Sequence, residues 1–331
     1  MKISNGNNNV IPIVLITDEN YVLPTAVAVT SMIKNKNKNS HYNIYILHNK
    51  LPRKIQNQFQ QLSSEDVSIN FIEPENSKFL LSVKDKREND YISAAVLFKF
   101  AIPQIFKEYD KILYLDGDTI INGDLSMLYN TDIKDNYAGV IKDIHPILSG
   151  AYKHLNIDTY FNAGIILYNI SKILSDNIDE YLNSKEILEK TKKFFWFEQD
   201  TYNIVFNKNV KYLHPKYNFI IESWNKYGIK NSCKVFDISS KEGKSLYKNA
   251  IIYHLASEQK PWIYKNGLMR KSWEKYYKLS PFTSLPIENK IYKYTNKNTL
   301  LQKIFSVKNS TNHKVVTIFG IKFKFRRKKH A

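Results

Sequence analysis

Two aspartates one residue apart, Asp116 and Asp118, are the residues whose types and spacing most favour chemistry. They follow residues 112–115, an apolar run that predicts a buried strand. Side chains at positions i and i+2 of an extended backbone point the same way, so the two carboxylates could hold one divalent cation. Buried carboxylates are costly unless they are paired or bound to a metal. The alternative is a hairpin turn that starts at Asp116-Gly117.

A histidine late in the chain is a candidate for a third metal ligand. Residues 251–255 predict a strand, and His254 stands near its end. A lone histidine at a strand end is usually structural. His254 therefore becomes a ligand only if the fold places it beside Asp116 and Asp118.

The first part of the chain alternates strands and helices, which predicts the sheet that must position these residues. Strands are expected at 11–16, 41–48 and 67–72, with helices at 25–34 and 51–62. This order predicts a parallel sheet covered by helices, with ligands at the carboxyl ends of the strands. No strand is followed by G-x-G-x-x-G or G-K-[ST], so the phosphate cradle of dinucleotide-binding and P-loop proteins is missing.

Later elements carry further candidates. We expect a long apolar helix at 91–106, a short helix at 125–128, strands at 137–142 and 161–169, and a helix at 201–206. Lys99, the charged residue of the first helix, either reaches the surface with its ammonium group or points at a phosphate or carboxylate of the site. Ala163 and Gly164 are small, which would let a ligand approach the backbone closely.

Polar residues at strand ends complete the set of candidates. After the first strand, Asp18 could accept hydrogen bonds from a base or ribose, and Tyr21 could stack. The alternative there is an ordinary loop with a helix cap. Glu198 and Asp200 follow an aromatic run, and their alternative role is to complement the dipole of the helix that they enter.

Composition and charge narrow the class of protein. The single cysteine, Cys233, excludes internal disulfides and a cysteine-based zinc site, and it fits a reducing compartment. Residues 1–9 are polar and lack the apolar core of a signal peptide. No apolar run approaches the roughly 18 residues that a membrane-spanning helix needs. The net charge is +18, most of it after residue 262.

Several motifs of this sequence, taken in order, resemble those of glycosyltransferase family 8. This family contains lipooligosaccharide galactosyltransferases, lipopolysaccharide glucosyltransferases and glycogenin. The resemblance covers roughly residues 10–265, and the ordered set is far more specific than a lone D-x-D. The motifs are Thr17-Asp18-Glu19-Asn20-Tyr21, Ile92-Ser93-Ala94 before Lys99, Leu113-Tyr114-Leu115-Asp116-Gly117-Asp118, Phe161-Asn162-Ala163-Gly164, Glu198-Gln199-Asp200 with Asn203, and His254 with Lys260-Pro261-Trp262.

The resemblance implies an α/β GT-A fold, Rossmann-like, and transfer of a hexose, galactose or glucose, from a UDP-sugar with retention of anomeric configuration. The implied acceptor is a lipooligosaccharide, lipopolysaccharide or capsule glycan. The implied cofactor is Mn²⁺ or Mg²⁺, held by Asp116, Asp118 and His254. The implied nucleotide-sugar site consists of Ile16, Asp18, Asn20, Tyr21, Lys99, Asp116, Gly117, Asn162, Ala163, Glu198, Gln199, Ser257 and Lys260.

By the same resemblance, three residues are expected to take part in catalysis. Gln199 would lie nearest the anomeric carbon. Because an amide is a poor nucleophile, Gln199 favours front-side departure and attack, or an oxocarbenium-like ion pair. Glu198 or Asp143 would supply the carboxylate of the alternative, a double displacement. The cation and Lys260 would stabilise charge that develops on the departing diphosphate.

Three positions depart from the family pattern. Lys99 stands where an arginine is usual and lacks its bidentate fork. Ser257 stands where a glycine is usual and could crowd the diphosphate. Glu198 is one methylene longer than the common aspartate, which could change the preferred hexose. None of the three is a metal ligand, so the sequence does not indicate an inactive relative.

The chain changes character after the last motif, which predicts a catalytic domain at 1–265 and a helical, basic C-terminal extension at 266–331. Residues around Trp273 predict a short amphipathic helix, 280–286 a linker, and 315–329 an alternation of apolar and basic residues. We expect the extension to bind an anionic membrane surface, the inner face of the bacterial cytoplasmic membrane. The alternatives are a nucleic-acid-binding protein that uses this tail and a solvated tail without a partner. The sequence leaves the oligomeric state open.

Overall fold

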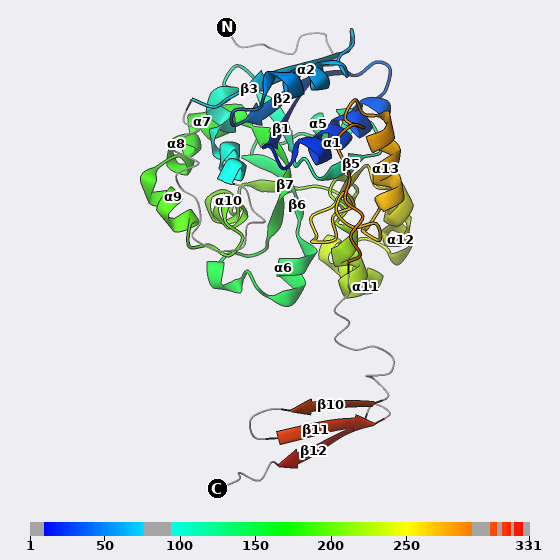
Figure 1. The fold of residues 1–331 in the computed structure, drawn as a ribbon. Coiled ribbons are helices and arrows are strands. Elements are labelled where there is room, and N and C mark those ends of the chain that lie inside the picture. Colours follow the sequence, from blue (N-terminus) through cyan, green and yellow to red (C-terminus); the bar gives the residue numbers. More distant parts are fainter. Residues whose placement is uncertain (1–9, 76–93, 293–304, 310–312, 319–320, 327–331) are drawn as a thin grey trace. The chain divides into compact units, whose positions relative to one another are not determined.

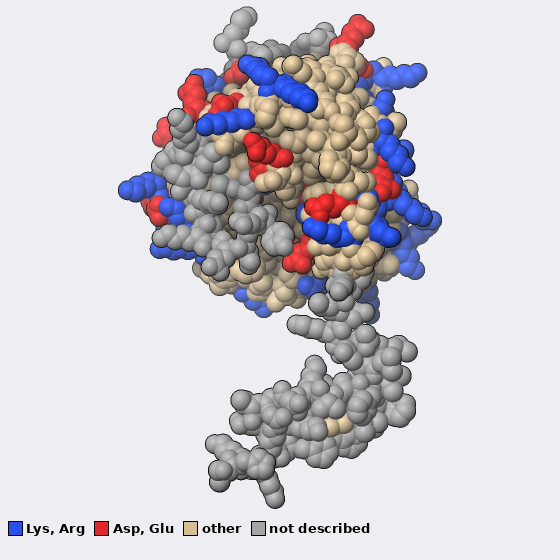
Figure 2. Space-filling model, viewed as in Figure 1, with Lys and Arg blue, Asp and Glu red and all other residues tan. Residues whose placement is uncertain are grey.

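A computed structural model describes residues 10–75, 94–292, 305–309, 313–318 and 321–326 (Figure 1). The chain forms two compact units, Met1–Lys290 (unit 1) and Ile291–Ala331 (unit 2). Unit 1 is an α/β structure built on a seven-stranded sheet, and unit 2 contains a three-stranded sheet. On the face of unit 1 drawn in Figure 2, acidic and basic side chains are interspersed.

The large sheet has the strand order β3-β2-β1-β4-β7-β6-β8. Strands β1 to β4 run parallel, as the β-α-β-α-β pattern predicts, whereas β7 runs antiparallel to β4 and β6. The predicted strands at 41–48 and 67–72 are confirmed at both ends. The seven strands are β1 (Val10–Thr17), β2 (His41–His48), β3 (Val67–Ile72), β4 (Lys111–Leu115), β6 (Ala138–Lys142), β7 (Phe161–Asn169) and β8 (Val210–Tyr212).

Both faces of this sheet are buried, which explains the almost continuous apolar runs of its central strands. Successive side chains of a strand point to opposite faces. In β1, Val14 and Ile16 therefore belong to one hydrophobic core, whereas Ile13 and Leu15 belong to another.

Helices cover the sheet and connect its strands (Figure 1). In the part of the chain that the structure describes, no helix is long and apolar enough to cross a bilayer. The helices are α1 (Val22–Lys34), α2 (Arg53–Gln60), η1 (Ala94–Ala101), α4 (Ile102–Ile105), α5 (Ser126–Tyr129), α6 (Ile144–Ser149), η2 (Lys153–Leu155), α7 (Ile170–Ser175), α8 (Ile178–Leu182), α9 (Lys185–Thr191), α10 (Glu198–Phe206), η3 (Pro215–Tyr217), α11 (Ile221–Phe236), α12 (Ser240–Asn249) and α13 (Arg270–Leu279).

A small two-stranded sheet brings distant parts of the chain together. Strand β5 (Thr119–Ile121) pairs antiparallel with β9 (Ile252–His254), and Thr119 lies opposite His254. Asp116-Gly117-Asp118 links β4 to β5, and these two strands belong to different sheets. The aspartates therefore do not form the tip of a hairpin, and the β5–β9 pairing places His254 beside them.

The prediction of one long apolar helix at 91–106 is wrong for residues 94–106. Residues 91–93 lie outside the described residues. The chain forms a 3₁₀ helix, η1, followed by the short α4. Pro103 lies in the first turn of α4. It lacks the N–H that would bond to the carbonyl of Lys99 in a continuous α-helix, so the helix must restart there.

The C-terminal part is only partly helical, which corrects the expectation of a helical extension. Helix α13 confirms the amphipathic helix around Trp273, and it belongs to unit 1. The described part of unit 2 forms antiparallel strands β10 (Phe305–Asn309), β11 (His313–Ile318) and β12 (Ile321–Arg326). An alternation of apolar and basic residues has the period of a strand, not of a helix. The end of the basic cluster, 327–331, lies outside the described residues.

Candidate active site

The strand ends of unit 1 enclose a cavity of about 570 Å³. Its walls come from the end of β1, from η1, from the β4–β5 link, from the residue after β6, from the start of β7, from the starts of α10 and α11, and from the chain after β9. Because β7 is antiparallel to β4, its first residues lie at the same edge as the carboxyl ends of β1 and β4. The predicted edge of the sheet therefore carries the cavity.

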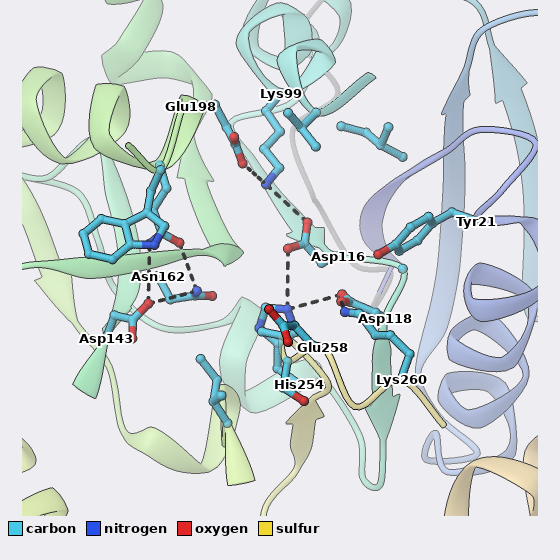
Figure 3. Close-up of a pocket in the computed structure, with 18 of the residues that line it drawn as sticks. Tyr21, Lys99, Asp116, Asp118, Asp143, Asn162, Glu198, His254, Glu258 and Lys260 are labelled. Carbon is cyan, nitrogen blue, oxygen red and sulfur yellow. Dashed lines mark hydrogen bonds and ion pairs between the residues drawn. The ribbon is translucent and has the colours of Figure 1, made fainter. Parts of the chain in front are cut away.

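Asp116, Asp118 and His254 form one group at the base of this cavity (Figure 3). One ligand atom of each lies within 4.8 Å of the others. His254 Nε2 lies 3.3 Å from Asp118 Oδ1 and 3.6 Å from Asp116 Oδ2. Two carboxylates and one imidazole suit a divalent cation such as Mn²⁺. The three residues thus have the composition and spacing of a metal site.

Gly164 in β7 leaves the room that this group occupies. A Cβ at this position would overlap His254 Cε1 and lie 2.6 Å from Asp116 Oδ2. We expected small residues here to admit a ligand. The structure shows instead that the space left by the missing Gly164 side chain is filled by two candidate metal ligands, His254 and Asp116. Gly117 is similar, since a Cβ there would overlap Thr25 Oγ1 of α1.

An amide network orients the imidazole of His254. Asn218 Nδ2 donates to Asn162 Oδ1 at 2.8 Å, and Asn218 Oδ1 lies 3.0 Å from His254 Nδ1. Because that oxygen can only accept, His254 Nδ1 donates, and Nε2 is the ring atom that faces the two carboxylates. Nε2 would therefore be the atom that binds a metal held between these carboxylates. The sequence patterns did not single out Asn218.

Two lysines balance the carboxylates. Lys260 Nζ lies 2.7 Å from Asp118 Oδ2, and it also donates to the carbonyl of Leu255 at 2.7 Å. Burial opposes ionisation of Asp118, but Lys260 and His254 outweigh it and hold the pKa of Asp118 well below its usual range. The carboxylate is therefore charged at neutral pH.

Lys99 is the second lysine, and it is 1% exposed. Its ammonium group lies 3.0 Å from Glu198 Oε1 and 3.2 Å from Asp116 Oδ1, and it donates to the carbonyl of Ala163 at 3.1 Å. Burial alone would lower the pKa of Lys99, but Asp116 and Glu198 reverse this and raise it. Of the two predicted orientations, the structure has the one that points at carboxylates.

Opposite Tyr21 and Lys260, the wall of the cavity includes Asp143 and Asn162 (Figure 3). Gln199 also lines the cavity and is hydrogen-bonded to Asn162. Asn162 Nδ2 donates to Gln199 Oε1 at 2.9 Å and to Asp143 Oδ2 at 3.3 Å. Gln199 Oε1 also accepts from the N–H of Ala163 at 3.0 Å. Burial raises the pKa of Asp143, against the opposing effect of Asn162.

The residues after β1 form a local turn, and two of them line the cavity. Asp18 Oδ1 accepts from the N–H groups of Asn20 and Tyr21 at 2.9 and 3.0 Å, which is the local turn that we gave as the alternative. Asp18 and Tyr21 also line the cavity. The ring of Tyr21 meets the Trp262 ring edge-on, with centroids 5.9 Å apart. Asn20 is exposed and does not line the cavity.

Most of the predicted site residues line this one cavity. Asn20 and Ala163 do not line it. The backbone of Ala163 is nevertheless hydrogen-bonded to the side chains of Lys99 and Gln199. Residues that the sequence patterns did not single out also line it, and those used below are His145, Glu222, Ser223 and Lys226. The predicted residues that line it are Ile16, Asp18, Tyr21, Lys99, Asp116, Gly117, Asp118, Asp143, Asn162, Glu198, Gln199, His254, Ser257 and Lys260.

Comparison with solved structures defines the class of the fold. The chain is similar to the galactosyltransferase LgtC in complex with donor and acceptor sugar analogs, with a TM-score of 0.65 and 20% identity, covering 83% of this chain and 98% of that one. It is also similar to the apo structure of the bifunctional glycosyltransferase WbbM, with a TM-score of 0.67 and 23% identity, covering 86% of this chain and 52% of that one. The fold is the GT-A fold of glycosyltransferases.

Sequence comparison then gives the family. The model of Glycosyl transferase family 8 matches residues 12–266, and the chain belongs to this family of glycosyltransferases. A lipopolysaccharide 1,2-glucosyltransferase of Escherichia coli is 24% identical over 304 residues, which cover 88% of this chain and 85% of that protein. The matched region ends close to the predicted boundary at 265, whereas unit 1 continues to Lys290.

Proposed function

We propose that this glycosyltransferase moves a hexose, galactose or glucose, from a UDP-sugar to a glycan acceptor with retention of anomeric configuration. The observation that carries the proposal is the meeting of Asp116, Asp118 and His254 with Lys260 in one cavity. A nucleoside diphosphate is a poor leaving group unless its developing charge is stabilised. This side of the cavity holds the groups that can supply that stabilisation.

The proposed cofactor is Mn²⁺ or Mg²⁺, held by Asp116, Asp118 and His254. Such a cation supplies Lewis-acid stabilisation of the departing diphosphate when bound. The chain contributes Lys260, whose ammonium group already lies in the same group of charges. Tyr21 and Asp18 line the cavity near Lys260 and would contact the nucleotide.

The proposed sugar side is the wall of Asn162, Glu198 and Gln199. Gln199 Oε1 accepts two hydrogen bonds from the chain, so the amide is held in one orientation. A fixed amide can stabilise an oxocarbenium-like ion but is a poor nucleophile, which supports departure and attack on one face. Asp143 and Glu198 are the carboxylates of the double-displacement alternative, and Glu198 is held by Lys99.

The test is UDP release from a panel of UDP-sugars by the full chain, with added Mn²⁺ or Mg²⁺ and with EDTA. We expect one or both of UDP-galactose and UDP-glucose to be turned over, and EDTA to abolish release. Turnover that persists after exhaustive chelation would contradict the metal assignment. Absence of turnover with every UDP-sugar would contradict the donor class.

We also propose a glycolipid acceptor, such as a lipooligosaccharide, lipopolysaccharide or capsule intermediate, at the inner face of the cytoplasmic membrane. Residues 291–331 contain no Asp or Glu, and basic residues such as Lys308, Lys322 and Lys324 would favour an anionic surface. Co-sedimentation with anionic vesicles tests this, and Lys322→Glu with Lys324→Glu should weaken it. The relatives reported above are glycosyltransferases and give no support to the nucleic-acid alternative.

A further inference from the structure

A second group of charged and polar side chains lines the cavity on the side of Asp143, away from Lys260 and Tyr21. We call it the α11 wall and define it as His145 of α6 with Glu222, Ser223 and Lys226 of α11. His145 follows Asp143 closely, and its N–H donates to Asp143 Oδ1 at 3.1 Å. The α11 wall therefore continues the sugar side of the cavity outward.

The charges of the α11 wall are not paired with each other. Glu222 and Lys226 are four residues apart on α11, in the order that favours an ion pair on a helix. Among the described residues, neither makes a salt bridge. Both side chains line the cavity instead. Each charge is thus available to a molecule that enters the cavity.

Within the described part of the chain, the ring hydrogen bonds of His145 all involve Nδ1. Its Nδ1 lies 2.7 Å from Tyr227 Oη and 3.4 Å from Lys226 Nζ. An ammonium group can only donate, so Nδ1 accepts and the ring proton lies on Nε2. Burial, and then Lys226, lowers the pKa of His145, which keeps the imidazole neutral. The Trp196 ring meets the imidazole edge-on, with ring centroids 6.3 Å apart.

We propose that the α11 wall binds an anionic group, a carboxylate or a phosphate, on the acceptor glycan. Lys226 supplies the charge, and His145 and Ser223 supply neutral donors around it. Glu222 accepts hydrogen bonds from hydroxyl groups of the same glycan. The diphosphate of the donor has Lys260 on the opposite side, so the two anions occupy different parts of the cavity. This inference rests on the proposed glycosyl transfer and names the chemistry of its acceptor.

The test compares three probes of similar size: glucose, glucuronic acid and glucose 6-phosphate. Their binding to the full chain is measured by ligand-observed NMR with saturating Mg²⁺ and UDP, which fill the donor side. A charge-assisted hydrogen bond predicts that at least one anionic probe binds about tenfold more tightly than glucose. Preference for glucuronic acid indicates a uronate-type acceptor, and preference for glucose 6-phosphate indicates a phosphorylated one.

Variants of α11, which is kinked at Gly228, make the test specific. Lys226→Gln should remove the preference and Lys226→Arg should keep it. Lys230→Gln, also in α11 but beyond the kink at Gly228 and outside the cavity, is the control and should keep it as well. Glu222→Gln should strengthen anion binding, because it removes a like charge. Equal or undetectable binding of all probes, or a preference that survives Lys226→Gln, would overturn the proposal.

The proposed function is checked separately by UDP release from UDP-sugars without any acceptor. If the wild-type chain releases UDP but shows no anion preference, the inference about the α11 wall fails and the transferase proposal stands. If it binds anionic probes but turns over no UDP-sugar, the donor proposal fails.

Discussion

The two sides of the cavity differ in whether their charged side chains have partners of opposite charge within the chain. On the metal side, defined as Asp116, Asp118 and His254 with Lys260 and Lys99, every charge has an opposite partner within the chain. On the α11 wall, Glu222 and Lys226 make no such pair with the described residues. Paired charges are in place before a ligand arrives, as electrostatic preorganisation requires. Unpaired charges gain a partner only when a ligand binds.

This difference fits two separate tasks: stabilising the leaving group and recognising the acceptor. With the proposed UDP-sugar donor, every transfer would release the same diphosphate, so the metal side can be the same for every acceptor. Acceptors differ from one another. A wall whose charges gain a partner only when a suitable ligand binds can discriminate among them. The substitutions below are designed to break one side while leaving the other intact.

The largest effect is expected for Asp118→Asn. The variant loses a proposed metal ligand and the partner of Lys260, and we expect UDP release to fall about 100-fold or more, since even loss of an outer partner costs 10- to 100-fold. Enzyme assays with Mn²⁺ titration measure it. Asp135→Asn, at an exposed position, is the control and should behave as wild type. Full activity of Asp118→Asn would mean that the metal side is not the reactive side.

The next effect is on stability. Lys99→Met leaves the buried Glu198 and the half-buried Asp116 without their cation, and we expect the free energy of unfolding to fall by about 3–5 kcal/mol. Urea unfolding measures the loss. Lys99→Met combined with Glu198→Gln should recover part of it. Lys226→Met, on the α11 wall, should leave the unfolding midpoint unchanged; an equal loss there would remove the contrast between the two sides.

A smaller effect is expected for Asn218→Ala. The imidazole of His254 loses the acceptor of its Nδ1 proton, and we expect the affinity for Mn²⁺ to fall about tenfold. Calorimetric titration of the purified chain measures it. Asn218→Asp keeps an oxygen at this position and should retain more of the affinity. Wild-type affinity in Asn218→Ala would show that the amide network does not orient the imidazole.

The smallest effect concerns pH. Burial raises the pKa of Asp143 in the folded state, so the folded chain holds this proton more tightly than the unfolded chain. The wild type should therefore lose stability relative to Asp143→Asn as pH rises from about 3.9, the usual aspartate value, to the higher folded value. Above that window the difference should be constant. Urea unfolding of both proteins across pH measures it, and a difference that grows in the opposite direction would contradict the raised pKa.

The sheet and the central motif could be predicted because their signals are local. Continuous apolar runs define β1 and β4 wherever the rest of the chain lies, and Asp116 and Asp118 follow β4 directly. The place of His254 beside them depends on β5 pairing with β9, which no local pattern reveals. The prediction for His254 was accordingly conditional, and the structure satisfies its geometric condition.

Residues whose role depends on tertiary contacts could not be predicted in the same way. Asn218 lies between η3 and α11 and matters only because His254 and Asn162 flank it. Glu222 and Lys226 have the spacing of an ordinary solvated helix face. The error at 91–106 has a local cause, because Pro103 interrupts the apolar run and lacks the N–H that a continuous helix needs.

Gly164 places a constraint on how this site can vary in evolution. It offers no ligand atom, yet any side chain at this position would displace His254 or Asp116. Related chains that keep the two aspartates and the histidine in this arrangement must therefore keep a glycine opposite them. Gly164 has no functional group, yet its substitution would disrupt the site as much as substitution of a metal ligand would.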